Sequence, residues 1–268
     1  MLAALLLVAA CGGGAPPPAA PTPSTAVPGP PEEQEPGWVV GASPLPRRPD
    51  GLGQVLPTPP ELRDRRLQAP DVLPPPVDGR FAATSSPVTP EVLARMGGTY
   101  REGCPVGPEG LRLLTVVFRG FDGAAHTGEL VVAAEAVEPT TAAFRRLFQI
   151  GFPLESVRLV TDADLAAPPT GDGSVTAAFV CRSARGQTRF SAHAYGLAVD
   201  VNPFHNPYVR DDLVLPELAS AYVDRTDVRP GMLLPGSEAV RAFTDQGFTW
   251  GGDFARPKDY QHMTLTGD

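Results

Sequence analysis

The sequence predicts an α+β domain with a small antiparallel sheet flanked by helices. Its apolar, β-rich runs are short, and two of them, residues 113–118 and 129–133, are joined by a glycine-rich segment suited to a hairpin. Helix signatures are segregated from these runs, and the chain lacks the regular β-α-β alternation that predicts a parallel sheet. No internal repeat points to another architecture.

The first 75 residues differ in composition from the remainder. Of the 33 prolines in the 268-residue chain, 15 lie in residues 1–60. Residues 12–75 are rich in small residues and proline and show no sustained apolar periodicity. Such a composition cannot bury a core and favours extended conformations. We therefore predict a disordered spacer over residues 12–75 and a single domain over residues 76–268.

Residues 1–11 predict an export signal. An aliphatic run precedes Cys11, and Val8-Ala9-Ala10-Cys11 resembles the bacterial lipobox, in which the signal is cut before a cysteine that carries lipid. The run is shorter than the about 20 residues of a membrane-spanning helix. The alternative is a short apolar start with an incidental cysteine. No Lys or Arg precedes Arg47, so the usual basic n-region is absent, as it would be with a start codon placed too far downstream.

Charge excludes one class of partner. The formal net charge is -8, and the Lys and Arg residues form no basic run. Phosphate contacts need clustered basic side chains, so a nucleic-acid partner is not expected. Contact with a membrane is expected only through the lipid on Cys11.

Two cysteines remain after Cys11, at positions 104 and 181. In an oxidising compartment, Cys104 and Cys181 could form one disulfide across a long loop, worth roughly 3–5 kcal/mol by the loop-entropy estimate. The alternative is a pair of buried free thiols.

The domain is expected to alternate short elements with polar connections. Proline is tolerated in the first turn of a helix and glycine ends helices, which indicates where the first two helices begin and end. Residues 209–236 show little periodicity, and a long connection of this kind often carries function. In chain order we expect a helix over residues 90–96 capped by Thr89, the two hairpin strands, a helix beginning at Pro139 and ending at Gly151, short strands at residues 157–160 and 176–181, a helix capped by Ser237 and running to Gln246, and a last strand over residues 261–265.

The stretch of residues 191–200 places His193 and Asp200 seven positions apart. In a continuous strand, residues seven apart point to opposite faces, so both side chains reach one point only if the backbone bends between them. Gly196 is the residue best able to bend, because it has no Cβ to restrict φ.

A second cluster, Asp259-Tyr260-Gln261-His262, lies near the C-terminus. Two histidines and a carboxylate provide three protein ligands for a zinc ion, with one coordination position left for water. Taken with residues 191–200, this cluster leads to the hypothesis of a Zn²⁺ site.

The combined pattern is similar to that of a known family. Ser191-x-His193-x-x-Gly196-x-Ala198-x-Asp200, followed by Asp259-x-x-His262, resembles the zinc D-Ala-D-Ala peptidases of the VanX/VanY type. Their superfamily includes lysostaphin-like peptidases and the hedgehog signalling domain, whose fold is the expectation here. Phe179-Val180-Cys181-Arg182 and Trp250-Gly251-Gly252-Asp253 fit the same context, and the resemblance covers roughly residues 100–268.

The resemblance implies a role for each residue of the pattern. His193, Asp200 and His262 correspond to the zinc ligands, Asp259 to the catalytic base and Arg182 to the arginine that stabilises the oxyanion. Zinc lowers the pKa of its bound water to about 7 and polarises the scissile carbonyl. Asp259 would take the proton of the water and pass it to the leaving amine. VanX-like members have Glu at this position and several L-alanyl-D-glutamate peptidases have Asp, which slightly favours the second substrate.

Two aromatic residues are expected to line the substrate groove. Tyr195 lies inside the motif and Trp250 precedes a glycine pair. Packing in the protein core is the alternative for both.

We therefore expect a zinc metallopeptidase, exported and lipid-anchored in a bacterial cell envelope, that hydrolyses a peptide bond in peptidoglycan stem peptides. The cut could be of the D-Ala-D-Ala carboxypeptidase type or the L-Ala-D-Glu endopeptidase type, and the oligomeric state stays open. The alternative is a non-catalytic, zinc-stabilised module that binds the cell wall. Asp259 argues against that alternative, because a structural site has no use for an acid beside an open coordination position.

Overall fold

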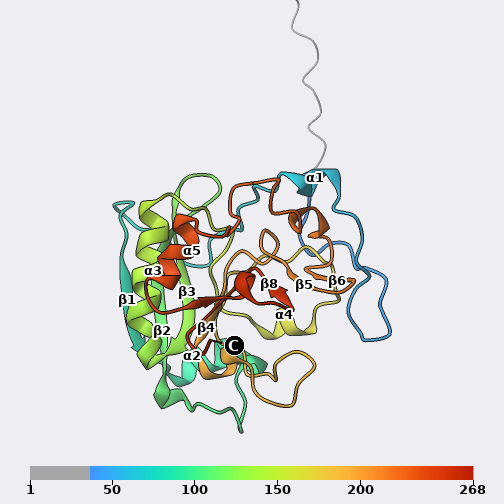
Figure 1. Cartoon of the computed structure of the whole chain (residues 1–268). Helices are drawn as coiled ribbons and strands as arrows, with labels where there is room; N and C mark the ends of the chain where they lie inside the picture. Colours follow the sequence, from blue (N-terminus) through green and yellow to red (C-terminus); the bar gives the residue numbers. More distant parts are fainter. Residues whose placement is uncertain (1–36, 268) are drawn as a thin grey trace, which may run out of the picture. The chain divides into compact units, whose positions relative to one another are not determined.

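The computed structural model describes residues 37–267. These residues form helices and three small sheets of three strands each, and every neighbouring pair of strands is antiparallel (Figure 1). The predicted α+β class is confirmed, although the antiparallel strands are divided among three sheets. Within the described range, no helix combines the length and apolar character needed to cross a membrane.

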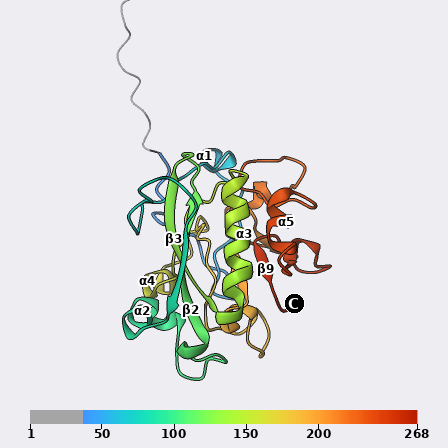
Figure 2. The same ribbon diagram turned by 90° about the vertical axis from the view of Figure 1, so that its left-hand side faces the viewer.

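The first sheet has the order β1-β2-β3 and is covered by a helix. Its strands are β1 (Ala83–Pro87), β2 (Leu111–Arg119) and β3 (Ala125–Ala133), and the predicted glycine-rich hairpin joins the last two. Helix α3 (Val137–Gln149) packs against β2 on one side and against α5 (Glu238–Thr244) on the other, as Figure 2 shows. The main core lies between these layers.

The ends of the helices largely follow the predicted caps. The Thr89 side chain accepts a hydrogen bond from Val92 N at the start of α2 (Pro90–Met96), and Ser237 does the same for Val240 N at the start of α5. Helix α3 begins two residues before Pro139, because proline is tolerated in a first turn whose N–H groups have no partner within the helix. The remaining short helical elements are α1 (Pro60–Arg63), α4 (Asp162–Ala166), η1 (Gly97–Thr99), η2 (Pro108–Gly110), η3 (Ala134–Ala136), η4 (Ala192–Tyr195), η5 (Ser220–Tyr222) and η6 (Gly251–Asp253).

The other two sheets bring the C-terminal part of the chain beside the 191–200 stretch. One has the order β4-β9-β7, and the other has the order β6-β5-β8. Consecutive strands β8 and β9 lie in different sheets, so the chain passes from one sheet to the other between Asp259 and His262. The strands are β4 (Ala198–Asp200), β5 (Tyr208–Arg210), β6 (Leu213–Leu215), β7 (Thr249–Trp250), β8 (Lys258–Asp259) and β9 (His262–Thr264).

The strands expected at residues 157–160 and 176–181 are absent from the described residues. Val157 and Thr176 form a single bridge, and Ala177 forms another with Asp200. The backbone N–H and C=O of Ala177 are both bonded to Asp200, at 3.1 and 2.9 Å. This segment therefore supports the end of β4 through one residue pair and forms no ladder.

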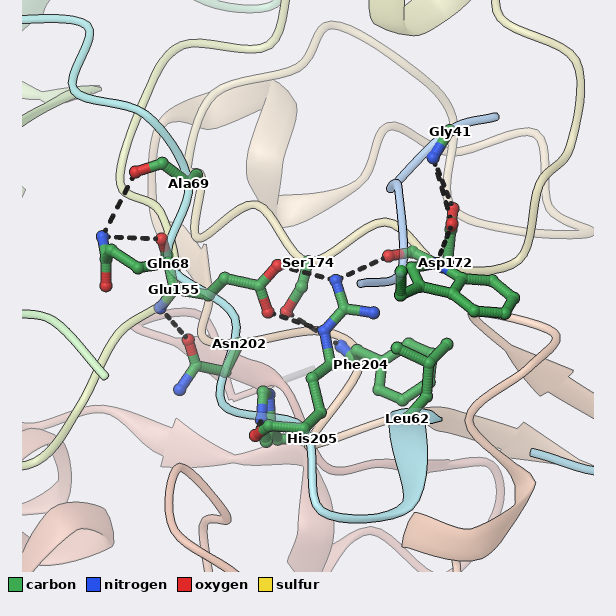
Figure 3. Close-up of polar contacts among 12 residues, drawn as sticks. Gly41, Leu62, Gln68, Ala69, Glu155, Asp172, Ser174, Asn202, Phe204 and His205 are labelled. Atoms are coloured by element: carbon green, nitrogen blue, oxygen red, sulfur yellow. Dashed lines mark hydrogen bonds and ion pairs between the residues drawn. The ribbon is translucent and has the colours of Figure 1, made fainter. Parts of the chain in front are cut away.

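The predicted spacer is wrong over residues 37–75, which we call the N-terminal segment. Leu62 and Arg65 are almost completely buried, and the Arg65 guanidinium donates from Nε and Nη2 to the Glu155 carboxylate at 2.7 and 2.6 Å. Figure 3 shows this segment lying against Glu155 and Asp172. Individual residues of this segment, rather than one face of a helix or strand, contact distant parts of the chain, so the sequence shows no periodic apolar pattern here. The rest of the predicted spacer, the predicted signal and Cys11 lie outside the described residues.

A disulfide joins Cys104 to Cys181, which are 77 positions apart in the sequence. The free-thiol alternative is therefore excluded by the structure. The bond links the loop after α2 to the segment that precedes residues 191–200, so it connects the first sheet to the surroundings of the candidate site.

Candidate metal and catalytic centre

Three side chains from separate segments meet at one point. His193 Nε2 lies 3.2 Å from Asp200 Oδ1 and 3.2 Å from His262 Nδ1, and the last two atoms are 3.1 Å apart. His193 and His262 are buried, while Asp200 is partly exposed. This triangle is the one group of three or more potential metal-binding residues found in the described part of the chain.

Gly196 sets the position of His193, as the sequence predicts. His193 lies in η4, where the Ser191 side chain accepts a hydrogen bond from His193 N, and Gly196 ends the turn with φ of 70°. A Cβ at Gly196 would meet Ala133 N at 2.4 Å. Ala133 N also donates to Gly196 O at 2.8 Å, so the bend is pressed against β3. Only glycine combines this φ with so close an approach.

Asp200 and His262 are brought together by strand register. They are directly opposite each other in the antiparallel pair of β4 and β9. Side chains of opposite residues lie on the same face of a sheet at short separation. The turn at Gly196 thus brings His193 close to Asp200, and the β4–β9 register places His262 opposite Asp200.

A backbone contact orients His193. Its Nδ1 lies 2.5 Å from the carbonyl oxygen of Ala178. A carbonyl only accepts, so Nδ1 carries the hydrogen and donates, and Nε2 faces Asp200 and His262. Second contacts of this kind fix the tautomer of metal-binding histidines.

Asp259 lies beside the triangle and has no partner for one oxygen. Its Oδ1 is buried and makes no hydrogen bond with any described residue. Burial and the nearby charge of Asp200 raise the pKa of Asp259 to about 6. For Asp200, burial is outweighed by the charges and hydrogen bonds of the two histidines, which lower its pKa. The pKa values of the two carboxyls are therefore shifted in opposite directions, as is typical of acid–base sites.

A pocket of about 380 Å³ opens over these groups, and we call it the catalytic pocket. Arg182 lines it, as predicted, and so does Asp259. Tyr195 and Trp250 are not among its lining residues. Trp250 is 1% exposed and donates its Nε1 hydrogen to Tyr260 O, so it belongs to the core. The prediction that Trp250 binds substrate is therefore wrong, whereas Tyr195 is exposed outside the lining of the catalytic pocket and its role stays a prediction.

Sequence reasoning missed most of the positive charge around the catalytic pocket. Arg185 and Arg189 share the loop of Arg182, and their recurrence just before the motif was a signal that could have been followed. No comparable signal marks the others, because they approach from β5 and from the loop before β8. The missed arginines are Arg185, Arg189, Arg210 and Arg256.

The donor set fits a metal ion. Two imidazoles and a carboxylate suit zinc and several other divalent metals. Tetrahedral ligands at 2.0–2.1 Å from an ion lie about 3.3 Å from one another, close to the separations in the triangle. The open catalytic pocket on one side of the three atoms leaves room for a further ligand.

An α+β domain with a His-Asp-His cluster that could bind a metal, a carboxyl of raised pKa and an open pocket is the arrangement typical of hydrolytic metal enzymes. Residues 185–265 match a family model described as D-alanyl-D-alanine carboxypeptidase, which confirms the resemblance stated from the motif. The match includes the three candidate ligands and Asp259, and it supports a peptidase function with a peptide as substrate. No curated protein and no solved structure matches the chain.

Proposed function

We propose that this protein is a zinc-dependent peptidase that hydrolyses a bond in peptidoglycan stem peptides. The observation that carries the proposal is the unpartnered buried oxygen of Asp259 beside three potential ligands in an open pocket. A module that only binds has no need of such a carboxyl, whereas hydrolysis requires a group that moves a proton.

His193, Asp200 and His262 would hold the ion. Zinc supplies Lewis acidity, which polarises a scissile carbonyl and makes water nucleophilic near neutral pH. The chain itself supplies the orientation of the ligands, because Ala178 O holds His193 and the β4–β9 register holds the other two.

Asp259 would move the proton. With a pKa of about 6, its carboxyl is mostly ionised at neutral pH and accepts a proton from the attacking water. The same carboxyl, now protonated, donates to the nitrogen of the leaving amine as the C–N bond breaks. A pKa close to the working pH makes both transfers efficient.

Arg182 would stabilise the negative charge that develops on the carbonyl oxygen. Its guanidinium lines the catalytic pocket and donates from Nη1 to Ser183 O at 3.3 Å. A fixed positive group aimed at developing charge contributes several kcal/mol in favourable sites, roughly 2.7–4 kcal/mol for one lost donor.

The substrate and the location remain parts of the proposal. The arginines around the catalytic pocket favour a peptide with free carboxylates, which stem peptides carry. Both the D-Ala-D-Ala and the L-Ala-D-Glu bond satisfy this chemistry. The disulfide and the Cys11 motif support an extracytoplasmic, lipid-anchored enzyme of the bacterial envelope.

Mass spectrometry of soluble muropeptides incubated with the zinc-loaded protein tests the proposal. We expect one new fragment that identifies the bond, and we expect Asp259→Asn to lower kcat by about 10²–10⁴-fold because the proton carrier is lost. Asp253→Asn is the matched control, since Asp253 is exposed and lies outside the catalytic pocket. If the zinc-loaded protein binds the muropeptide but does not cleave it, the proposed peptidase function fails and the wall-binding module remains.

A further inference from the structure

A second and larger cavity adjoins the catalytic pocket. It has a volume of about 1100 Å³, and we call it the side groove. Arg185, Leu215 and Gln261 line both the side groove and the catalytic pocket. The two spaces therefore adjoin each other at these three residues.

The side groove is built mainly from parts of the chain outside the family match. One wall comes from the N-terminal segment, at residues 38–41 and 67–72, and the other from the connection at residues 155–175. Val39, Val40 and Val72 line it with exposures of 67%, 45% and 61%. Exposed apolar side chains gathered in a concave site indicate a ligand.

Hydrogen bonds hold the two walls together. Gly41 N donates to the Asp172 carboxylate at 3.0 Å, and Trp38 Nε1 donates to the same carboxylate at 2.8 Å. Gln68 Nε2 donates to Glu155 O at 3.1 Å (Figure 3). The side groove is thus preformed, and a ligand need not order its walls.

We propose that the side groove binds the part of a peptide substrate that lies beyond the residues flanking the scissile bond. This inference rests on the proposed function. Ligand pockets usually measure about 300–1,000 Å³, so the catalytic pocket suits a dipeptide-sized group and the side groove accommodates several further residues. Its apolar walls fit small apolar side chains, and Arg185 at the junction fits a free carboxylate along the peptide.

Gly173 allows the side groove to be blocked selectively. It lines the side groove and is exposed, its φ lies outside the left-handed region, and a Cβ there meets no atom within 4 Å. Gly173→Trp therefore adds a large side chain at a lining position of the side groove where the Cβ itself meets no neighbour. Gly37→Trp is the matched control, because Gly37 is equally open and does not line the groove.

The experiment compares three substrates that share the bond identified in muropeptides: the free dipeptide, the pentapeptide, and the disaccharide-linked pentapeptide. We expect Gly173→Trp to lower the ratio of kcat/KM for pentapeptide to kcat/KM for dipeptide by about tenfold or more, the value of one buried apolar side chain. Gly37→Trp should keep the ratio of the unmodified protein. An unchanged ratio in Gly173→Trp, or a loss seen only with the disaccharide-linked substrate, would overturn the assignment to peptide.

Binding separates this inference from the proposed function. Fluorescence anisotropy of a labelled pentapeptide measures affinity without turnover. If nothing is hydrolysed, the proposed function fails, yet weaker pentapeptide binding by Gly173→Trp than by Gly37→Trp still supports the side groove. Equal binding by the two variants refutes it, whether or not the protein is active.

Discussion

Arg65→Ala tests whether the N-terminal segment is part of the folded domain. The side chain is fully buried, binds Glu155 through two hydrogen bonds, donates to Asp172 O at 2.9 Å and lies 4.4 Å from the centre of the Phe204 ring. Removing one partner of a buried ion pair leaves the other charge uncompensated, which costs about 3–5 kcal/mol. We expect the free energy of unfolding to fall by that amount.

Guanidinium denaturation followed by circular dichroism measures this change. Arg66→Ala is the control, because its contact with Asp64 is exposed on both sides and should contribute at most about 1 kcal/mol. The double variant Arg65→Met with Glu155→Leu should recover part of the loss, since it leaves no unpaired charge in the core. Equal stability of Arg65→Ala and Arg66→Ala would refute the reasoning and return residues 37–75 to the class of spacer.

The same variant has a characteristic pH dependence. Burial raises the pKa of Glu155, and the charge and hydrogen bonds of Arg65 oppose that rise. Without Arg65, the folded-state pKa moves further above the unfolded value. At pH below the unfolded value both states hold the proton, so the stability deficit is smallest there and grows as pH rises through the folded pKa.

Two further predictions concern the first sheet. Burial alone would lower the pKa of His126, but its contacts with Asp122 and Asp71 outweigh burial and raise the pKa. The stability that protonated His126 contributes is therefore fully present below about pH 6.5 and is lost as pH rises through the folded-state pKa. His126→Gln should therefore cost about 1–3 kcal/mol at pH 5.5 and less at pH 8.5 in denaturant titrations; a constant cost would contradict the assignment. Gly196→Ala should lower the free energy of unfolding by about 2–5 kcal/mol, because the new Cβ adds backbone strain and overlaps β3. Gly123 also has a positive φ but lies in open space, so Gly123→Ala should cost only about 1–2 kcal/mol. Equal losses in the two variants would show that the contact with Ala133 does not matter.

The candidate ligands were predictable because their signal is local. A glycine between His193 and Asp200 permits the bend that would bring both side chains to one point, and the structure places φ of Gly196 at 70°. The partner of this stretch, His262, was found from the types of residue available as metal ligands, and the resemblance added support. Its actual placement depends on the β4–β9 register, which joins residues 62 positions apart and leaves no mark on either segment alone.

The N-terminal segment and Trp250 were mispredicted for opposite reasons. Proline-rich composition suggested that residues 37–75 cannot bury a core, yet Leu62 and Arg65 fill sites that the rest of the domain prepares. The glycine pair after Trp250 suggested that its ring lines the substrate groove. Those glycines instead allow η6 to pack closely, since a Cβ at Gly252 would overlap the Trp250 ring and one at Gly251 would meet Asp259 O.

The backbone at or beside His193, Asp200 and Asp259 contacts a part of the chain remote from it in sequence. Gly196, which ends η4, accepts a hydrogen bond from Ala133 N of β3. Ala177 forms two backbone hydrogen bonds with Asp200. Asp259 pairs with Tyr208 in the third sheet. A backbone contact survives substitution of the side chain that it positions. Variants of His193, Asp200 or Asp259 should therefore remain folded, and a loss of hydrolysis in them reports on chemistry, whereas Gly196→Ala changes the frame itself.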